Sequence, residues 1–430
     1  MQTSSRALAL ARLVASPARL AFALVLVIHG ALILLMGVKI TPDSAAYSGW
    51  ADILLAHHFN YAAFGREATS TFPPLLYSGF VSLVAVCKLL AGERWATVLV
   101  LLNLLADALT AALLVDAVCA LTRRRLAWMG ALGLYLVSFE ILDWTRCALS
   151  DITFLLLSFA IFHLAARGLW TNERPRFQVA TLLLLGAAVF YRPTGIVLVA
   201  PIVATLFMAA GWRHLESSVS AAPSPEEPST DTRRRARFGL PAVVLGVCAV
   251  LTTVIFVVHG ALAQNPERWP LAFLKSTLRY NHAHYALGEI VYDRRETWHA
   301  PPVSLLDYAA VSADRFAHYF CFASRSFSRS HNALAALFFV PIYALAALGV
   351  RELLRRSTRI PSLLDPCGKV VLSSLLVVWS FAVFHALIQV DFDWRYRLPI
   401  VPHLDLLAAV GLAHLDSMRA ARQKRLQAPA

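Results

Sequence analysis

Apolar and polar residues alternate along this chain in long blocks. Runs of mostly about 18–25 apolar residues, the length that crosses a bilayer core as a helix, recur between short segments rich in arginine. The pattern predicts an all-α polytopic membrane protein with about ten transmembrane helices, plus interfacial helices in the outer loops. The expected spans are residues 20–38, 95–121, 126–140, 152–168, 178–190, 193–211, 239–260, 332–350, 369–390 and 398–416.

The composition agrees with this pattern. Hydrophobic residues make up 58% of the 430 residues, only 15% are charged, and the mean hydropathy is +0.61. Soluble domains of this length rarely reach such values. A transmembrane β-barrel would show short alternating segments instead of long apolar runs, so a helical membrane protein is expected.

The formal net charge of +13 is concentrated in clusters between the apolar runs. Short basic loops are typical of the cytoplasmic side of a membrane protein. The charge therefore indicates topology rather than nucleic-acid binding, and it predicts a multi-pass plasma (inner) membrane protein with both termini cytoplasmic. The clusters are residues 123–125, 167–176, 233–237, 351–359 and 419–425.

The predicted organisation is a single transmembrane domain over residues 1–416, followed by a basic cytoplasmic tail at 417–430. Within the domain we expect a first outer loop at 39–94 with interfacial helices, and a large outer loop at 261–331. The Pro- and Ser-rich composition around residues 212–238 predicts a flexible cytoplasmic linker there.

One apolar run, residues 73–91, tests this topology because it is long enough to cross. A crossing there would place the basic residues 123–125 on the outer side, against the positive-inside rule. Pro73 and Pro74 begin the run and Lys88 interrupts it. We therefore predict that it lies along the outer interface or re-enters the membrane.

An acidic residue, Asp43, follows the first apolar run in "KITPDSAAYSGWADILL". The next residues predict a short helix with Tyr47, Trp50 and Leu54 on one stripe. Two interpretations are open for Asp43. It caps an interfacial amphipathic helix, or its carboxylate takes part in chemistry at the membrane surface.

Two further outer segments carry charged residues. In "DWTRCALSD", Asp143, Arg146 and Asp151 precede the span that begins at residue 152. An acid at the mouth of a span must be solvated, paired or used as a cap. Asp151 is therefore either a helix cap with Arg146 anchoring to headgroups, or part of an acid/base or cation-binding cluster.

Arginine is unusually dense in the outer segment "QVDFDWRYRLP". Arg395, Tyr396 and Arg397 fall between two spans, where the positive-inside rule disfavours arginine. A guanidinium offers a planar fork suited to phosphate, so a phosphate site is favoured over salt bridges to Asp391 and Asp393. Arg192, in "YRP" at the outer end of two short helices, is a similar candidate whose alternative is snorkelling to the interface.

The large outer loop contains residue types that can bind metals, but their spacing is only weak evidence for a metal site. A solvated acceptor-binding surface is favoured over a metal site, because no HExxH or paired CxxC motif occurs. The chain also lacks a Walker A loop, a GxGxxG following a strand and a GxSxG elbow, which disfavours a nucleotide-driven reaction. The loop residues are His282, His284, His299, Glu289 and Asp293.

The order of these segments resembles a known family. "PDSAAY" in an outer loop, an interfacial "PPLLYSGF", a long span ending in "TRRR", and then "RCALSD" and "YRP" look like membrane glycosyltransferases of the GT-C type. These include protein O-mannosyltransferases of glycosyltransferase family 39, aminoarabinose transferases and oligosaccharyltransferases. The ending "DWRYRLPIVPHLDLLAAVGL" is similar to the tail of many bacterial members, and the likeness runs from residue 19 to 416.

The resemblance implies an enzyme that transfers a sugar from a polyprenyl-phosphate donor to an envelope lipid, glycan or protein on the outer face. It assigns Asp43 as catalytic base or metal-linked acid and Asp151 as the second acid. Many members carry paired acids where Ser44 follows Asp43 here, so participation of a divalent cation stays open. The implied substrate-binding residues are Tyr47, Arg146, Arg192, Arg395, Tyr396 and Arg397.

A transporter or flippase of a lipid-linked sugar is the alternative. It would use the same arginines without breaking a bond, and ionisable residues within the spans would favour it. The notable ones are Asp107, Asp116, His163 and His385.

Overall fold

The chain folds as a bundle of helices. The computed structural model describes residues 16–68, 77–169, 174–208, 305–323, 328–357, 366–388 and 394–427, and no strand occurs within these ranges. The predicted all-α class is therefore confirmed for the described part of the chain. The predicted linker at 212–238 and the span at 239–260 lie outside the described residues.

In the first half of the chain, the described residues form nine α-helices and two short 3-10 helices. Their bounds are α2 Pro17–Met36, α3 Pro42–Ala56, α4 Tyr61–Glu67, α5 Ser78–Ala91, η2 Gly92–Arg94, α6 Trp95–Thr122, α7 Arg125–Leu136, α8 Phe139–Thr145, α9 Asp151–Arg167, α10 Arg174–Tyr191 and η3 Pro193–Leu198. The C-terminal part adds α14 Leu305–Tyr319, α15 Arg329–Ser357, α16 Pro366–Ile388, η6 Trp394–Ile400 and α17 Val401–Gln427.

Five helical segments in the described ranges are long and apolar enough to cross a bilayer, or six if one bent pair is counted as a span. The protein is thus a membrane protein with transmembrane helices. The expected number of about ten stays a prediction, because the segments Phe177–Tyr191 and Pro193–Met208 are shorter and residues 239–260 are not described. The five are Pro17–Met36, Ser78–Thr122, Arg329–Glu352, Cys367–Leu387 and Arg395–Gln427.

The span predicted at 126–140 is broken in the structure. Helix α7 ends at Leu136, and α8 leaves it at an angle of 52°. A helix end inside apolar surroundings needs partners for its last carbonyls. His29 on α2 provides one, because its Nε2 lies 3.2 Å from the carbonyl oxygen of Leu136.

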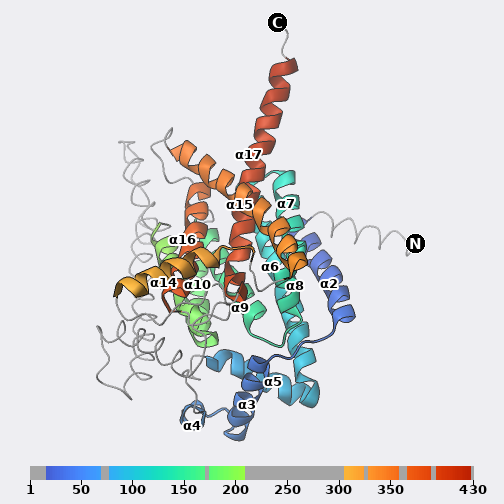
Figure 1. The fold of residues 1–430 in the computed structure, drawn as a ribbon, viewed down its shortest axis with the longest axis vertical. Coiled ribbons are helices and arrows are strands. Elements are labelled where there is room, and N and C mark those ends of the chain that lie inside the picture. Colours follow the sequence, from blue (N-terminus) through green and yellow to red (C-terminus); the bar gives the residue numbers. More distant parts are fainter. Residues whose placement is uncertain are drawn as a thin grey trace, which may run out of the picture.

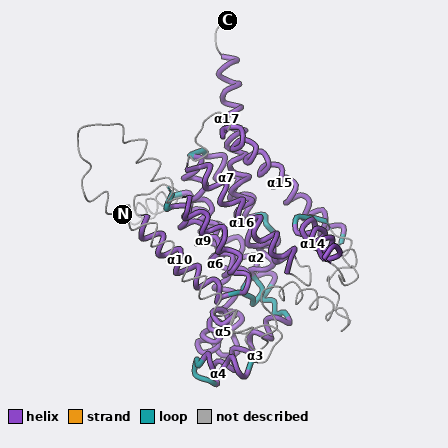
Figure 2. Tube along the Cα trace, turned by 90° about the vertical axis from the view of Figure 1, so that its left-hand side faces the viewer, coloured by secondary structure: helices purple, strands orange, loops and turns teal. Residues whose placement is uncertain are grey.

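Helix α6 is the central element of the N-terminal half and contacts α2, α7, α9 and α17 (Figures 1 and 2). A buried polar network joins four of the helices around its Asp107. The Asp107 carboxylate lies 2.6 Å from Nδ1 of His29, accepts a 2.8 Å bond from the Tyr135 hydroxyl and a 3.3 Å bond from the Thr145 hydroxyl. All four side chains are fully buried, so the network fixes α2, α7 and α8 on α6.

Helices α3, α4 and α5 form a separate lobe, which lies at the opposite end of the molecule from the C-terminal end of α17 (Figure 1). The lobe has its own apolar core, in which Leu54 of α3, Phe64 of α4 and Phe80 of α5 are fully buried. At the other end, Arg124 of the basic cluster after α6 pairs with Asp416 of α17 at 3.5 Å. The lobe and the basic tail therefore lie at opposite ends of the molecule, and the side of the membrane that each faces stays a prediction.

The apolar run 73–91 forms helix α5 from Ser78, packs against α3 and continues through η2 into α6. Together these helices make a segment of 45 residues, about twice what a bilayer requires. Lys88 on α5 pairs with Asp52 of α3 at 2.6 Å. The placement of α5 along the outer interface stays a prediction.

Helices α15 and α17 approach closely at two glycines, and we expect Gly411→Val to destabilise the protein. A Cβ at Gly411 would lie 2.1 Å from the carbonyl oxygen of Leu345, and backbone cannot move aside as a side chain can. The expected cost is about 1–3 kcal/mol, seen as a lower midpoint of thermal unfolding in detergent. Gly133→Val on α7 is the matched control, since a Cβ there meets no atom within 4 Å; an equal loss in both variants would contradict the close contact.

Candidate active site

Asp43 lies in the first turn of α3 and does not cap it. Thr41 is the N-cap, with its hydroxyl accepting from the Ser44 backbone N–H, while the Ser44 hydroxyl accepts from the Thr41 N–H. Pro42 occupies the first helical position, which suits its fixed φ. The capping interpretation of Asp43 is therefore wrong, and its carboxylate is available for other contacts.

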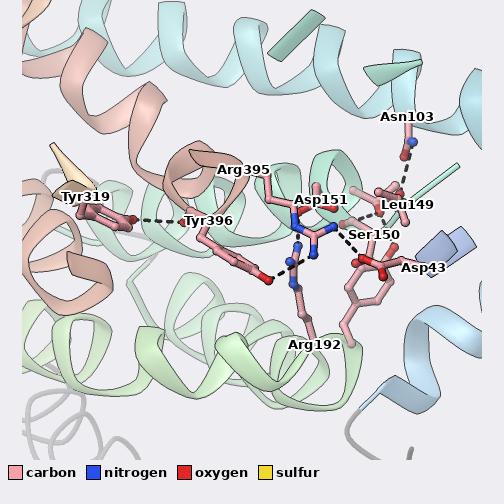
Figure 3. Close-up of polar contacts among 11 residues, drawn as sticks. Asp43, Asn103, Leu149, Ser150, Asp151, Arg192, Tyr319, Arg395 and Tyr396 are labelled. Atoms are coloured by element: carbon pink, nitrogen blue, oxygen red, sulfur yellow. Dashed lines mark hydrogen bonds and ion pairs between the residues drawn. The ribbon is translucent and has the colours of Figure 1, made fainter. Parts of the chain in front are cut away.

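The partner of Asp43 comes from the far end of the sequence. Nη1 of Arg395 lies 2.7 Å from Oδ2 of Asp43, although the two residues are 352 positions apart. Nη2 of Arg395 donates a 3.1 Å bond to the Tyr396 hydroxyl (Figure 3). The Asp43 side chain is still 46% exposed, against 16% for Arg395, so the carboxylate keeps an open side toward solvent.

Asp151 and Arg192 form a second ion pair at the same place. Nη1 of Arg192 lies 2.5 Å from Oδ1 of Asp151, and the side chains are only 10% and 4% exposed, respectively. Burial is the largest single influence on the pKa of the Arg192 guanidinium and acts to lower it, but its neighbours, Asp151 first among them, together raise the pKa above its ordinary value. Arg192 therefore keeps its positive charge, and Asp151 serves chiefly as its buried counter-ion.

The two pairs meet at the ring of Tyr396. The Cζ atoms of Arg395 and Arg192 lie 5.0 and 6.0 Å from the centre of this ring, within the usual range of a cation–π contact (Figure 3). Tyr396 is itself fixed by His385, whose ring stacks on it at 5.0 Å, and by Tyr319, whose hydroxyl donates to its carbonyl oxygen at 3.2 Å. One site is thus formed by residues from four elements: α3, α9, the α10–η3 corner and η6.

Backbone packing sets the position of Arg192. The residue stands at a corner where its N–H bonds to the Ala188 carbonyl at 3.2 Å and its carbonyl accepts from Gly195 at 2.8 Å. A Cβ at Gly195 would come within 2.1 Å of the Ala188 carbonyl oxygen. Only glycine allows this approach, which explains the "PTG" sequence after Arg192. Gly79 of α5 packs less closely against the same corner, where a Cβ would lie 3.1 Å from the Cα of Tyr191.

The segment that leads to Asp151 is fixed by hydrogen bonds from two other parts of the chain. The amide of Asn103 on α6 donates to the carbonyls of Cys147 at 2.8 Å and Leu149 at 3.3 Å. Lys39 forms an isolated parallel bridge with Cys147, which ties the α2–α3 connection to the same segment. Helix α6 and the α2–α3 connection therefore determine where the acid at the start of α9 lies.

Aromatic side chains line the site on the lobe side. Tyr47 and Trp50, on the stripe of α3 that begins at Asp43, contact Tyr77 at ring distances of 5.5 and 5.9 Å. Burial raises the pKa values of the Tyr47 and Tyr77 hydroxyls, while the positive charge of Arg192 acts to lower both pKa values. Both phenols thus stay protonated at neutral pH and can donate hydrogen bonds near Arg192.

Two predicted site residues pair with acids other than Asp43 and Asp151. Arg146 pairs with Asp143 at 2.6 Å. Arg397 is fully buried, and its guanidinium binds the Glu140 carboxylate through two nitrogens, with Nε 3.1 Å from Oε2. Arg397 also faces the ring of Phe339 at 3.9 Å. It therefore joins η6 to α8 rather than lining the site.

Sequence reasoning missed Glu140, Asn103, Trp144 and Tyr77. Trp144 faces Arg395, with the guanidinium carbon 5.7 Å from the ring centre. Glu140 gave one usable signal, because an acid within an apolar run must have a partner. The others gave none, since an amide or a ring in a membrane protein usually has only a packing role.

No group of three or more His, Cys, Asp or Glu residues that could hold a metal ion occurs within the described ranges. Asp43 and Asp151 each face a guanidinium instead, so this pair of acids does not fit a divalent cation. The histidines and acids of 282–299, together with Asp391 and Asp393, lie outside the described residues.

Comparison with protein-family models, with curated proteins and with solved structures finds no match for this chain.

The different burial of the two acids predicts different costs of neutralising them. Asp151→Asn leaves the buried Arg192 without its counter-ion and should cost about 3–5 kcal/mol. Asp43→Asn breaks a half-exposed pair and should cost less than about 1 kcal/mol. Thermal unfolding in the same detergent compares them. Equal losses would show that the two ion pairs do not differ in burial as described.

Proposed function

We propose that this protein is a membrane glycosyltransferase of the GT-C type. It transfers a sugar from a polyprenyl-phosphate donor to an envelope acceptor, either a lipid, a glycan or a protein, on the outer face of the plasma membrane. The observation that carries the proposal is the half-exposed carboxylate of Asp43 beside two guanidiniums, those of Arg395 and Arg192, which contact one tyrosine ring.

The guanidiniums suit the donor phosphate. A phosphodiester carries one negative charge, and the released polyprenyl phosphate carries more, so fixed positive charge stabilises the transition state over the ground state. A guanidinium has five N–H donors, and one nitrogen of Arg192 is used for Asp151. Its other nitrogen groups, with the Tyr47 and Tyr77 hydroxyls nearby, suit an anionic oxygen.

Asp43 suits the role of general base. In the proposed step the acceptor hydroxyl loses its proton to the Asp43 carboxylate while its oxygen forms a bond to the anomeric carbon. The bond from that carbon to the phosphate oxygen breaks, and its electron pair leaves with the polyprenyl phosphate. This single displacement inverts the anomeric centre. Asp151 acts as a positioning residue in this scheme, because it holds Arg192.

The placement of the site supports transfer on the outer side. The site lies where the α3–α5 lobe meets the ends of α9 and α10, opposite the C-terminal end of α17 (Figure 1). With the basic tail cytoplasmic, as charge predicts, the site faces the periplasmic or external side, and both termini lie in the cytoplasm. A lipid-linked donor reaches this depth with its prenyl chain still in the bilayer.

Transport of a lipid-linked sugar is the second candidate. The fully buried ion pair of His29 and Asp107 favours it, because ionisable groups within spans mark ion pathways in carriers. The same pair, however, binds the Leu136 carbonyl and the side chains of Tyr135 and Thr145. These contacts give it a structural role at the break between α7 and α8, so transfer is the better-supported proposal.

The decisive experiment measures free polyprenyl phosphate released from a panel of polyprenyl-phosphate sugars by the purified protein in lipid, with mixed envelope acceptors. The wild type should release it, and Asp43→Asn should be about 100- to 10,000-fold slower. Asp52→Asn, a change of the same charge on the same helix but paired with Lys88, is the matched control and should keep the rate.

If the wild type released no polyprenyl phosphate and still moved the lipid-linked sugar across the membrane, that outcome would contradict the transferase proposal and support transport. A product with retained anomeric configuration would exclude the single displacement.

A further inference from the structure

The aromatic cluster of the lobe extends beyond the two phenol hydroxyls that lie near Arg192. It consists of Tyr47 and Trp50 on α3, Tyr77 at the start of α5, and Phe80 behind them. Ring centres lie 4.8 to 5.9 Å apart: Tyr47–Phe80 4.8 Å, Tyr47–Trp50 5.6 Å and Trp50–Tyr77 5.9 Å. Phe80 is fully buried, whereas the other three are only partly buried, so they keep surface for a ligand.

The position of these rings is tied to the site. Asp43, Tyr47 and Trp50 follow one another at spacings of four and three on α3, so they share one face of this helix. The charges of Arg192 and Asp151 act on the hydroxyls of Tyr47 and Tyr77. Consider a ligand whose phosphate lies at the guanidiniums and whose reacting carbon lies at Asp43. The group attached to that carbon then lies beside these rings.

We infer that Tyr47, Trp50 and Tyr77 form the platform on which the sugar of the lipid-linked donor stacks. This inference rests on the proposed function for the identity of the donor. A sugar ring carries apolar C–H faces and polar hydroxyl edges. Aromatic faces with a negative quadrupole attract the C–H groups, and the two phenols can hydrogen-bond to the edges.

The alternative ligand for an aromatic surface, the prenyl chain, fits this place less well. The rings lie in a lobe that also carries the ion pair of Lys88 with Asp52 and a bond from Lys88 to the Ser48 carbonyl. A hydrocarbon chain gains most from an apolar surface without hydroxyls or charges. The sugar is also the part of the donor joined directly to the phosphate, and the rings are next to the guanidiniums.

The test separates the two ligands by binding alone. Affinities are measured for prenyl-phosphate-linked glucose, mannose, galactose and arabinose, and for short-chain prenyl phosphate without a sugar, with purified protein in nanodiscs. In the wild type, at least one sugar-bearing lipid should bind more tightly than prenyl phosphate. Trp50→Ala should weaken that ligand about tenfold while changing prenyl phosphate less than twofold, and Trp50→Phe should retain most of the affinity.

Two controls accompany these variants. Trp95→Ala removes an equal side chain at the start of α6, which packs against the apolar core of the lobe and is contacted by Lys88, and it should change neither affinity. Arg395→Gln should weaken both ligands alike. Bound prenyl phosphate in Trp50→Ala also reports that the variant is folded.

A parallel loss of both ligands in Trp50→Ala would assign the rings to the prenyl chain and overturn the inference. Unchanged affinities for both ligands in Trp50→Ala would give the rings a packing role only and would also overturn the inference. The same holds if the wild type binds no sugar-bearing lipid more tightly than prenyl phosphate. Because no turnover is measured, a protein that shows the sugar preference but releases no polyprenyl phosphate would keep the platform and lose the transferase proposal.

Discussion

A charged side chain inside a helix bundle in a bilayer has no water to solvate it, so it must find a partner on another helix. Three pairs in this protein obey that constraint and organise the fold. His29 with Asp107 joins α2 to α6, Glu140 with Arg397 joins α8 to η6, and Asp151 with Arg192 joins α9 to the corner after α10. The first two pairs connect elements that are far apart in sequence, 78 and 257 positions, and the third joins two consecutive helices.

The same constraint separates the roles of the two acids at the candidate site. Asp151 is buried and forms an ion pair with Arg192, so its negative charge holds this guanidinium in place. Asp43 is paired with Arg395 but remains half exposed. A base must be reached by the hydroxyl whose proton it takes, and of these two carboxylates only Asp43 meets that requirement. The polar network around Asp107 supports both, because it fixes the broken helix α7–α8 that leads to Asp151.

The aromatic side chains extend this arrangement outward. Tyr396 is the common neighbour of the two guanidiniums, and its own position depends on His385 and Tyr319 from the C-terminal helices. On the other side, Tyr47 and Trp50 of α3 turn toward Tyr77. Charge lies at the centre and rings on both sides, a distribution suited to a ligand with an anionic group and a neutral polar ring.

The sequence by itself determined the helical class, the membrane location and most helix bounds, because apolar run length and helix capping are local properties. It also singled out Asp43, Asp151, Arg192, Arg395 and Tyr396, since charge beside an apolar run is costly and therefore noticeable. Only the tertiary structure decided which charges meet. Arg395 pairs with Asp43, whereas Arg397, two positions later, pairs with Glu140. Pairing across 352 positions depends on how helices pack, and no local pattern encodes that. The break at Leu136 was likewise set by a contact, that of its carbonyl with His29 of α2, which run length cannot express.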